Sequence, residues 1–479
     1  MKVRTRMAPS PTGEIHVGSM ATLLKNYAFA KKNGGQFILR IEDTDQTREV
    51  PGAVERILKT VSAYGLQWDE GPDIGGPFAP YTQSQRLPRY SAAAEQLVTQ
   101  GQAYRCFCTK ERLEIVHADQ VAKKQQPKYD GHCRNLSAEE VARRLAQNES
   151  SVIRLKVPKE ESISFTDLIR GPITVSGNDV DDQVLLKSDG FPTYHLAVVV
   201  DDNDMEVTHI LRGEEWISST PKHILLYRAF GWTPPIFAHI PIFLNPDGKG
   251  KMSKRKGDVS AQSFLDQGFL PEAMLNFFMI LGWAPSDQRE ILTLDEYVRE
   301  FDPSAISAKS VVFDLKKLAW MNGVYIRALS PEDLTHRLEP FIPAGRDPSM
   351  MKQIIPLVAE RLVTLADIGP LTAYFFEKIE PNPAELLRRA ESKEVVIGQL
   401  EQTINVLNQL ESWTVEALEK TLRQMQLDHD WQPKQYFMML RVALTAQTAT
   451  PPLFDTMFVL GKSLVVQRLT DSQALLRTN

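Results

Sequence analysis

The feature that most constrains the fold is a loop rich in proline and glycine near the start of the chain. Residues 9–19 read PSPTGEIHVGS and follow an alternating stretch, MKVRTRMA, that predicts a short strand. Proline fixes φ and glycine accepts angles that other residues avoid, so their density here predicts a backbone held in one particular shape. Such a loop lets a ligand approach the main chain closely, and we expect a binding site there.

The segments after this loop complete a βαβ unit. Residues 20–32 (MATLLKNYAFAKK) carry apolar side chains at helical spacing and end at Gly34 and Gly35, which predicts a helix and its C-cap. Residues 36–41 (QFILRI) predict a strand that is closed by the acidic residues 42–45. In such units ligands gather at the carboxyl ends of the parallel strands. We therefore expect an α/β domain with its site at this loop.

The pattern changes twice further along the chain. Residues 103–190 carry shorter, more polar elements, including a helix capped at Ser137 and a strand over 151–157. Strand character is expected again at 194–200 (YHLAVVV), before an acidic turn, so the middle segment is interpreted as an insertion into a split α/β domain. Beyond about residue 328 nearly every segment predicts a helix, and that part is expected to be all-α. Two of these helices are expected at 331–338 and 415–425.

Composition and charge exclude several classes of protein. The 479 residues are 43% hydrophobic and 24% charged, which is typical of a globular protein of two to four domains. The start of the chain has no apolar signal region, and the apolar stretch 274–283 is too short to span a bilayer, so we expect a cytoplasmic protein without a membrane partner. The odd count of 3 cysteines argues against a disulfide scaffold. With a net charge of −5, any nucleic acid must bind at local basic patches.

Two short motifs carry the chemistry. His16 and Gly18 precede the first predicted helix, where main-chain amides attract phosphate and an imidazole can donate a hydrogen bond to it. A basic run, KGKMSKRK, occupies residues 249–256. Taken alone, such a histidine more often caps or packs, and such a run is more often a solvated loop. The occurrence of both motifs in this order on a split α/β domain is far more specific for a function than either motif alone.

The two motifs resemble the HIGH and KMSKS signatures of class I aminoacyl-tRNA synthetases. The segments around them resemble the bacterial glutamyl-tRNA synthetase family and cover the first 330 residues densely. The matching segments are RMAPSPTG at 6–13, RIEDTD at 40–45, YHL at 194–196, LRGEE at 211–215, KMSKR at 251–255 and FDLKKLAWMNGVYIR at 313–327. The resemblance implies a Rossmann-like catalytic domain with an α+β insertion, followed by an all-α anticodon-binding domain.

The resemblance also implies how the chain is divided and what it does. The expected parts are the first half of the catalytic domain at 1–104, an insertion that binds the acceptor arm at 105–190, the second half of the catalytic domain at 191–245, a stem-contact region with the KMSKR loop at 246–328, and the anticodon-binding domain at 329–479. The implied enzyme is a glutamate–tRNA ligase, which joins L-glutamate to ATP as glutamyl-adenylate and passes the glutamyl group to tRNA-Glu. In-line attack at the α-phosphate needs mainly positioning and charge stabilisation.

Site residues are carried over from the matching segments. The implied catalytic residues are His16, Gly18, Lys251 and Lys254. The implied ATP-binding residues are Pro9, Thr12, Gly13, His16, Gly18, Glu215, Lys251, Ser253, Lys254 and Arg255. The implied glutamate-binding residues are Arg6, Ala8, Ser10, Glu42, Tyr194 and Arg212, where the guanidinium fork suits a carboxylate. For Arg212 the alternative is a structural salt bridge with Glu214 or Glu215.

One residue is implied to read the anticodon. Arg361 lies where glutamate-specific relatives place an arginine that contacts the third anticodon base, with donors that suit the cytosine of tRNA-Glu and no room for the guanine of tRNA-Gln. The alternative is an arginine that caps or solvates a helix face. Whether tRNA-Gln is also charged therefore stays open.

The expected cofactors are ATP and Mg²⁺, while zinc is doubtful. Some family members build a zinc site from a CxC and a later CxH, and Cys106, Cys108 and Cys133 match three of those positions. The fourth is Asn135, a poor zinc ligand, although His132 or Tyr129 could substitute. The alternative is a set of reduced buried cysteines, so no metal ligand is assigned.

Two alternative functions and one expectation about assembly complete the sequence-based hypotheses. A glutaminyl-tRNA synthetase shares the first domain, but its C-terminal part would be a β-barrel. A catalytically silent tRNA-binding module is disfavoured by the presence of His16, Gly18, Lys251 and Lys254. The expected partners are tRNA-Glu, L-glutamate and ATP, and the protein is expected to be a monomer.

Overall fold

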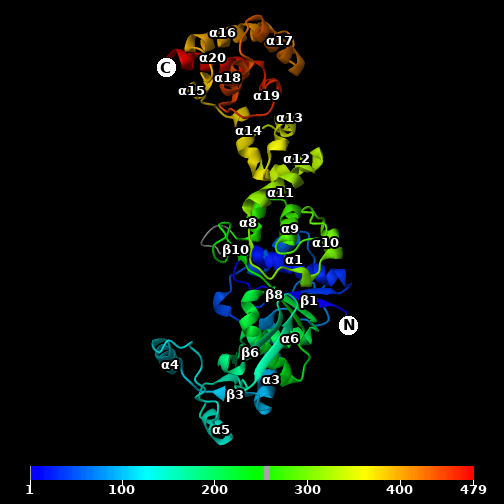
Figure 1. Ribbon diagram of the computed structural model, residues 1–479, viewed down its shortest axis with the longest axis vertical. Helices are drawn as coiled ribbons and strands as arrows, with labels where there is room; N and C mark the ends of the chain where they lie inside the picture. Colours follow the sequence, from blue (N-terminus) through cyan, green and yellow to red (C-terminus); the bar gives the residue numbers. More distant parts are fainter. Residues whose placement is uncertain (1, 253–258, 479) are drawn as a thin grey trace. The chain divides into compact units, whose positions relative to one another are not determined.

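The structure is a computed structural model that describes residues 2–252 and 259–478 (Figure 1). The chain divides into two compact units. Unit 1 contains residues 1–266 and 271–318, and unit 2 contains residues 267–270 and 319–479. The finer five-part division stays a prediction. Within the described ranges, no helix is long and apolar enough to cross a bilayer.

Unit 1 opens with the expected βαβ unit. Strand β1 (Arg4–Met7) pairs in parallel with β2 (Gln36–Leu39), and α1 (Val17–Lys32) connects them. The chain leaves the helix through Gly34, whose φ of 59° favours glycine. A Cβ on Gly35 would lie 2.0 Å from the carbonyl oxygen of Val3, so the close approach of the two segments requires glycine there.

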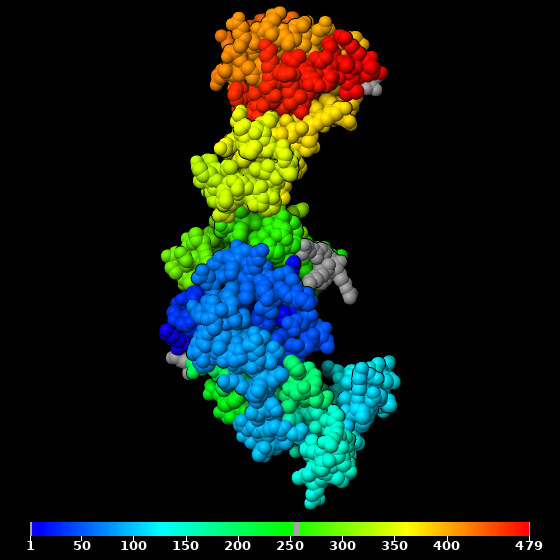
Figure 2. Space-filling view, turned by 180° about the vertical axis from the view of Figure 1, so that it is seen from behind, coloured from blue at the N-terminus to red at the C-terminus, as the bar shows by residue number. Residues whose placement is uncertain are grey.

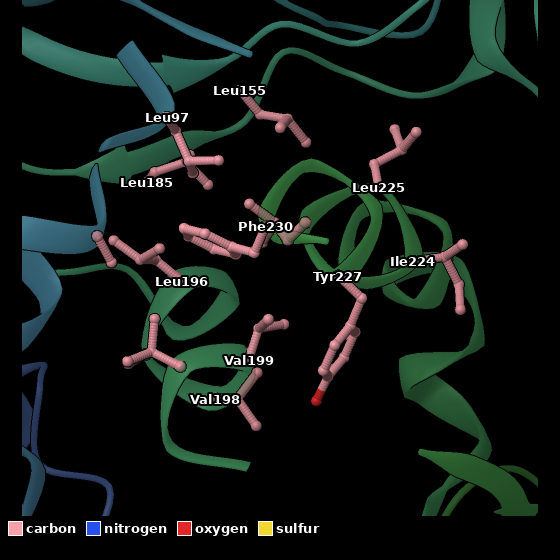
Figure 3. Packing of buried hydrophobic residues seen from close by; sticks show 14 of the residues in the cluster. Leu97, Leu155, Leu185, Leu196, Val198, Val199, Ile224, Leu225, Tyr227 and Phe230 are labelled. Carbon is pink, nitrogen blue, oxygen red and sulfur yellow. The ribbon is translucent and has the colours of Figure 1, made fainter. Parts of the chain in front are cut away.

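A second sheet carries the other half of the α/β architecture. Its strands run in the order β6 (Gly171–Ser176), β5 (Ser162–Asp167), β9 (Ile236–Ile240) and β8 (His209–Gly213). The pairs β5 with β9 and β9 with β8 are parallel, and β5 with β6 is an antiparallel hairpin. Side chains of α3 (Leu87–Thr99), α6 (Tyr194–Asp204) and α7 (Thr220–Phe230) form one apolar cluster with residues of this sheet. Figure 3 shows the part of this cluster that the three helices contribute, including Leu97, Leu196 and Tyr227.

The prediction of a strand at 194–200 is wrong, because these residues begin helix α6. The helix also includes the residues that were expected to form an acidic turn. The run from Leu196 to Val200 is buried on every side of the helix, so no polar face marks the helical period in the sequence. An uninterrupted apolar run does not distinguish a buried strand from a buried helix. The helical conformation lets the buried Asp201 and Asp202 reach arginines of other segments.

The insertion forms a small antiparallel sheet with two helices. Its strands run in the order β3 (Ala103–Cys106), β4 (Val152–Leu155) and β7 (Val184–Leu186). Helix α5 (Ala138–Ala146) begins after Ser137, whose hydroxyl accepts the N–H of Glu140 as predicted, and α4 (Lys110–Ala122) begins after Thr109. Strand β4 lies within the predicted strand at 151–157.

The remaining elements of unit 1 lie around the first βαβ unit. They are α2 (Ala53–Ala63), β10 (Phe243–Leu244), α8 (Ala261–Asp266), α9 (Pro271–Ile280), α10 (Leu294–Glu300) and β11 (Val311–Val312). Helix α1 packs against α9, where the buried Lys25 donates to the carbonyl of Phe278 at 3.1 Å. In the space-filling view, residues 50–100 cover much of the visible face of unit 1 (Figure 2).

Unit 2 is helical, as the sequence predicts. Its helices are α11 (Leu315–Arg327, from residue 319 onward), α12 (Pro331–Leu338), α13 (Pro348–Val358), α14 (Ile368–Phe376), α15 (Pro383–Leu386), α16 (Lys393–Gln409), α17 (Val415–Asp428), α18 (Pro433–Thr445), α19 (Leu453–Leu460) and α20 (Lys462–Thr478). Polar N-caps such as Ser330 and Thr414 begin them. The described residues of unit 2 contain no strand, which removes the β-barrel expected of a glutaminyl-tRNA synthetase.

Candidate active site

A cavity of about 960 Å³ opens in unit 1 between the first loop and the carboxyl ends of the strands. Its walls come from the loop after β1, the segment after β2, the start of α6, the end of β8 and the residues after β9. This volume suits a ligand of nucleotide size. The cavity therefore lies where parallel strands direct their loops, as the βαβ pattern predicts.

His16 caps helix α1 at one side of the cavity. Its Nδ1 accepts the N–H of Gly18 at 2.9 Å, so in the neutral imidazole the proton resides on Nε2. A Cβ on Gly18 would lie 3.1 Å from that Nδ1, so glycine keeps this cap open. The capping bond orients the ring with Nε2 as a hydrogen-bond donor beside a helix N-terminus, where an anion is stabilised.

A cation lies on another wall. Nζ of Lys251 is 3.1 Å from a carboxylate oxygen of Glu215, which lies in the short 3-10 helix η4 (Glu214–Ser219). Both side chains line the cavity and are about half exposed, so the ion pair can open without a large desolvation cost. Ser253, Lys254 and Arg255 of the same motif lie outside the described residues.

A buried chain of charged residues lies beside the cavity near the first strand, and two of its members, Arg6 and Glu42, line the cavity. Arg6 binds Asp202 with two nitrogens at 3.1 and 3.3 Å, and Arg40 joins the same carboxylate at 2.8 Å. Arg40 also binds Glu42 at 3.1 Å. Burial raises the pKa of Glu42, while the neighbouring arginines lower it. Arg6 is thus already paired with a carboxylate of the protein.

Arg212 differs, because each of its partners in the described chain is neutral. Its Nε donates to Nε2 of His239 at 3.1 Å, and one terminal nitrogen donates to Thr220 at 2.8 Å. The other terminal nitrogen lies 3.2 Å from Nδ1 of His223 and 3.3 Å from the hydroxyl of Tyr194. Burial lowers the pKa of Arg212, which is only 5% exposed. The expected alternative, a salt bridge with Glu214 or Glu215, is not among these contacts.

A buried guanidinium without a counter-ion is costly, and it gains most when a carboxylate enters the site. The two longest bonds of Arg212 go to Tyr194 and, at 3.5 Å, to the carbonyl of Trp216. Both partners line the cavity, and their rings lie with centroids 4.3 Å apart and planes tilted by 34°. The N–H groups of Arg212 that form its longest hydrogen bonds therefore face the cavity. A ligand can replace these two partners at the lowest cost in free energy.

The sequence of each unit matches a known family. Residues 2–320 match the family described as tRNA synthetases class I (E and Q), catalytic domain. The chain belongs to this family. Residues 333–472 match a second description, anticodon binding domain, so the helical part of the synthetase is accounted for as well.

The synthetase resembles proteins named glutamate–tRNA ligase along nearly its whole length. The one from Dehalococcoides mccartyi is 44% identical over 477 residues, covering 98% of this chain and 96% of the relative. The one from Clostridioides difficile is 43% identical, covering 98% of both chains. A crystal structure of a glutamate tRNA ligase from Elizabethkingia meningosepticum in complex with its amino acid has a TM-score of 0.90 and 35% identity, covering 99% and 100% of the two chains.

Most site residues expected from the sequence meet around the one cavity. The ones that line it are Arg6, Ala8, Pro9, Ser10, Thr12, His16, Gly18, Glu42, Tyr194, Arg212, Glu215 and Lys251. Gly13 does not line it, although its φ of 133° explains why the loop needs glycine there. The roles of these residues stay predictions.

Sequence reasoning missed the polar residues behind Arg212. Asp167, Thr220, His223 and His239 are all buried, and they come from β5, α7 and β9. One signal was available: polar residues interrupt apolar strand patterns in SISFTD and IFAHI. Their convergence was not visible, because β5 and β9, which lie side by side in this sheet, are far apart in sequence.

Arg361, the expected anticodon reader, lies in unit 2 at the end of the short helix η8 (Ala359–Arg361). Its side chain is exposed, and one terminal nitrogen donates to the carbonyl of Thr450 at 2.5 Å. Arg441 donates to the same carbonyl at 3.0 Å. Two arginines thus share one loop, and the contact of Arg361 with a base stays a prediction.

The three cysteines form one cluster in the insertion. The sulfur atoms of Cys106, Cys108 and Cys133 all lie within 4.8 Å of one another. Tyr129 supplies a fourth atom, since its hydroxyl oxygen is 3.3 Å from the sulfur of Cys106 and 3.6 Å from that of Cys108. His132 is not part of this group in the described chain, and its residue is exposed. Three sulfurs and one oxygen therefore lie close together.

Proposed function

We propose that this chain is a glutamate–tRNA ligase. The oxygen of the glutamate α-carboxylate attacks the α-phosphorus of ATP, the bond to the β-phosphate breaks, and pyrophosphate leaves. A ribose hydroxyl of the 3′-terminal adenosine of tRNA-Glu then attacks the acyl carbon of glutamyl-adenylate. The bond between this carbon and the phosphate oxygen breaks, and AMP leaves. The observation that carries the proposal is Arg212, a buried cation with neutral partners that borders a nucleotide-sized cavity.

The glutamate substrate is held at both ends. Arg212 binds the side-chain carboxylate, with Tyr194 beside it. Arg6, which is paired with Asp202, lines the same cavity and adds positive potential. Glu42 and the hydroxyl of Ser10 receive the α-ammonium group. Because Arg6 already has Asp202 as its counter-ion, Arg212 supplies the dominant ion pair to the substrate.

The first loop and the basic motif serve ATP. His16 donates through Nε2 to phosphate oxygens, and Gly18 lets the nucleotide approach the main chain. Glu215 accepts from the ribose hydroxyls once Lys251 turns to the phosphates, and Lys254 stabilises charge as pyrophosphate departs. Mg²⁺ enters with ATP and neutralises its phosphates.

A charging assay tests the proposal directly. Purified protein is incubated with ATP, Mg²⁺ and either labelled glutamate or labelled glutamine, with tRNA-Glu and tRNA-Gln in separate reactions. We expect glutamate on tRNA-Glu, and no charging with glutamine. Tight tRNA binding without charging would instead identify a catalytically silent tRNA-binding module. A pyrophosphate exchange that needs no tRNA would contradict the family pattern, in which tRNA completes the site.

We further propose that the cysteine cluster binds one zinc ion, with Tyr129 in place of the ligand missing at Asn135. A separation of 3.6 Å between the sulfurs of Cys108 and Cys133 suits two corners of a tetrahedral site. Such an ion would fold the insertion and would take no part in the reaction. Metal analysis of protein purified without chelators should find about one zinc per chain, and Cys133→Ser should lower it while His132→Ala should not. Metal-free wild-type protein would identify reduced buried cysteines.

A monomeric state and a cytoplasmic location stay predictions.

A further inference from the structure

A polar row crosses the second sheet behind the cavity. The parallel register of β8 and β9 places Arg212 directly opposite His239. On the next strand, β5, the carboxylate of Asp167 lies 2.6 Å from Nδ1 of His239. Asp167 and His239 are fully buried, so water does not separate the groups. Three neighbouring strands thus supply a carboxylate, an imidazole and a guanidinium in sequence.

The hydrogen bonds of this row assign the tautomer of His239. Arg212 can only donate, so Nε2 of His239 must accept, and the ring proton resides on Nδ1. The carboxylate of Asp167 accepts from Nδ1, which holds that tautomer. Burial lowers the pKa of His239, so the ring stays neutral near pH 7. The opposite tautomer would direct an N–H against the N–H of Arg212.

A second imidazole behaves in the same way. Nδ1 of His223 faces a terminal nitrogen of Arg212 at 3.2 Å, so it accepts, and its Nε2 donates to Nδ1 of His195 at 3.1 Å. Burial lowers the pKa of His223 and of His195. The guanidinium is therefore positioned by neutral acceptors, and its charge is left for a ligand of the cavity.

We infer that Asp167, acting through His239, is a positioning residue that fixes the direction of Arg212 and so determines the affinity for the glutamate side chain. The inference rests on the proposed function. Asp167 does not line the cavity and reaches the substrate only through two other side chains. Its carboxylate is separated from Arg212 by the ring of His239. From there it stabilises the position of the guanidinium without binding the donors that face the cavity.

A purely structural role of Asp167 is the competing explanation. Its Oδ1 accepts the N–H groups of Ile169 and Arg170, both at 3.0 Å, so the carboxylate also shapes the turn after β5. Loss of those bonds would lower stability without changing the substrate preference. The two explanations therefore differ in their effect on glutamate binding.

The test is Asp167→Asn, assayed by pyrophosphate exchange with saturating tRNA. The amide oxygen keeps the N–H groups of Ile169 and Arg170, so the amide nitrogen replaces Oδ2, which accepts from both the main-chain N–H and Nδ1 of His239. That nitrogen would donate to Nδ1 of His239, move the ring proton to Nε2 and turn Arg212 away. The expected result is a rise in KM for glutamate of about 10- to 100-fold, with kcat and the KM for ATP changed less than about threefold. Equal changes in both KM values, or an unchanged KM for glutamate, would overturn the inference.

A rescue variant separates positioning from folding. A glutamine at position 239 can present its carbonyl oxygen to Arg212 without a tautomer, so Asp167→Asn combined with His239→Gln should recover most of the lost affinity for glutamate. Glu70→Gln is the matched control, because Glu70 is a buried carboxylate that binds Arg4 and Tyr81 outside the cavity. It should lower the melting temperature and leave the KM for glutamate unchanged. If the double variant has the same raised KM for glutamate as Asp167→Asn alone, positioning through the ring is refuted. If the wild type shows no glutamate-dependent exchange, the proposed function is overturned as well.

Discussion

Replacement of Arg212 by glutamine should remove the side-chain carboxylate from the recognition of glutamate. Arg212 is the buried cation that borders the cavity without a carboxylate partner among its described contacts. Glutamine keeps a polar group that can bond to Thr220 or His239, so the cavity is not left with several unpaired groups. The change therefore tests the charge more than the packing.

The size of the effect follows from the two longest bonds of Arg212, at 3.3 Å to Tyr194 and 3.5 Å to Trp216. In the complex these donors would instead form charge-assisted bonds to the carboxylate, each contributing about 1.5–3 kcal/mol. Their joint loss of about 3–6 kcal/mol predicts that kcat/KM for glutamate falls by roughly 10²- to 10⁴-fold. Most of the fall should appear in KM, because the ion pair exists before the transition state.

The assay is pyrophosphate exchange with saturating tRNA, with glutamate and ATP varied in turn. The KM for ATP should change less than about threefold. Arg468→Gln is a matched control, since Arg468 is a buried arginine of unit 2 that donates only to the carbonyls of Leu444 and Glu377 in the described structure. It should change stability but not the KM for glutamate. A fall in kcat/KM below about tenfold, or an equal loss for ATP, would refute Arg212 as the carboxylate receptor.

Three further predictions test other parts of the molecule. Lys254→Ala should lower kcat for activation by roughly 10²- to 10³-fold, since it removes a donor used mainly in the transition state, and Arg255→Ala should do less; equal, small effects would contradict these roles. Wild-type protein should charge tRNA-Glu and largely ignore tRNA-Gln, whereas Arg361→Gly should admit tRNA-Gln, and an unaltered ratio in the charging assay would remove Arg361 from the specificity argument. Burial lowers the pKa of Lys25 to about 7, so its charge opposes folding fully below about pH 7 and less as the pH rises toward the ordinary lysine pKa. Lys25→Met should therefore raise the free energy of unfolding more at about pH 6 than at about pH 10, by roughly 4 kcal/mol. A gain independent of pH in denaturant titrations would show that folding does not lower the pKa of Lys25.

Local patterns sufficed for elements whose signal lies within a few residues. The loop at 9–19, the helix after it and the cap at Ser137 were predicted from proline, glycine and serine chemistry, which acts on the nearest peptide units. The helical character of residues beyond 328 followed from apolar spacing in the same way. Helix α6 was predicted as a strand, because a run buried on all sides carries no period of its own.

The residues that we propose to contact the substrates were visible in the sequence as motifs, and the order of these motifs indicated the family. His16, Tyr194 and Arg212 each stand in a short recognisable segment, because the chemistry at each point needs one side-chain type. What the sequence did not reveal is how Arg212 is held. Its neighbours Asp167 and His239 lie on other strands, and only the register of the sheet brings them together.

The sequence by itself thus determined the α/β and helical architecture, the family and most of the expected site residues that line the cavity. The tertiary structure decided which arginine has its own carboxylate: Arg6 is paired with Asp202, and Arg212 is surrounded by neutral acceptors. The physical reason is that a residue type specifies a charge, whereas the partner of that charge depends on distances of about 3 Å between segments far apart in the chain. Burial then gives the pairing its effect, because an ion without a counter-ion in a low dielectric gains most from a ligand of opposite sign.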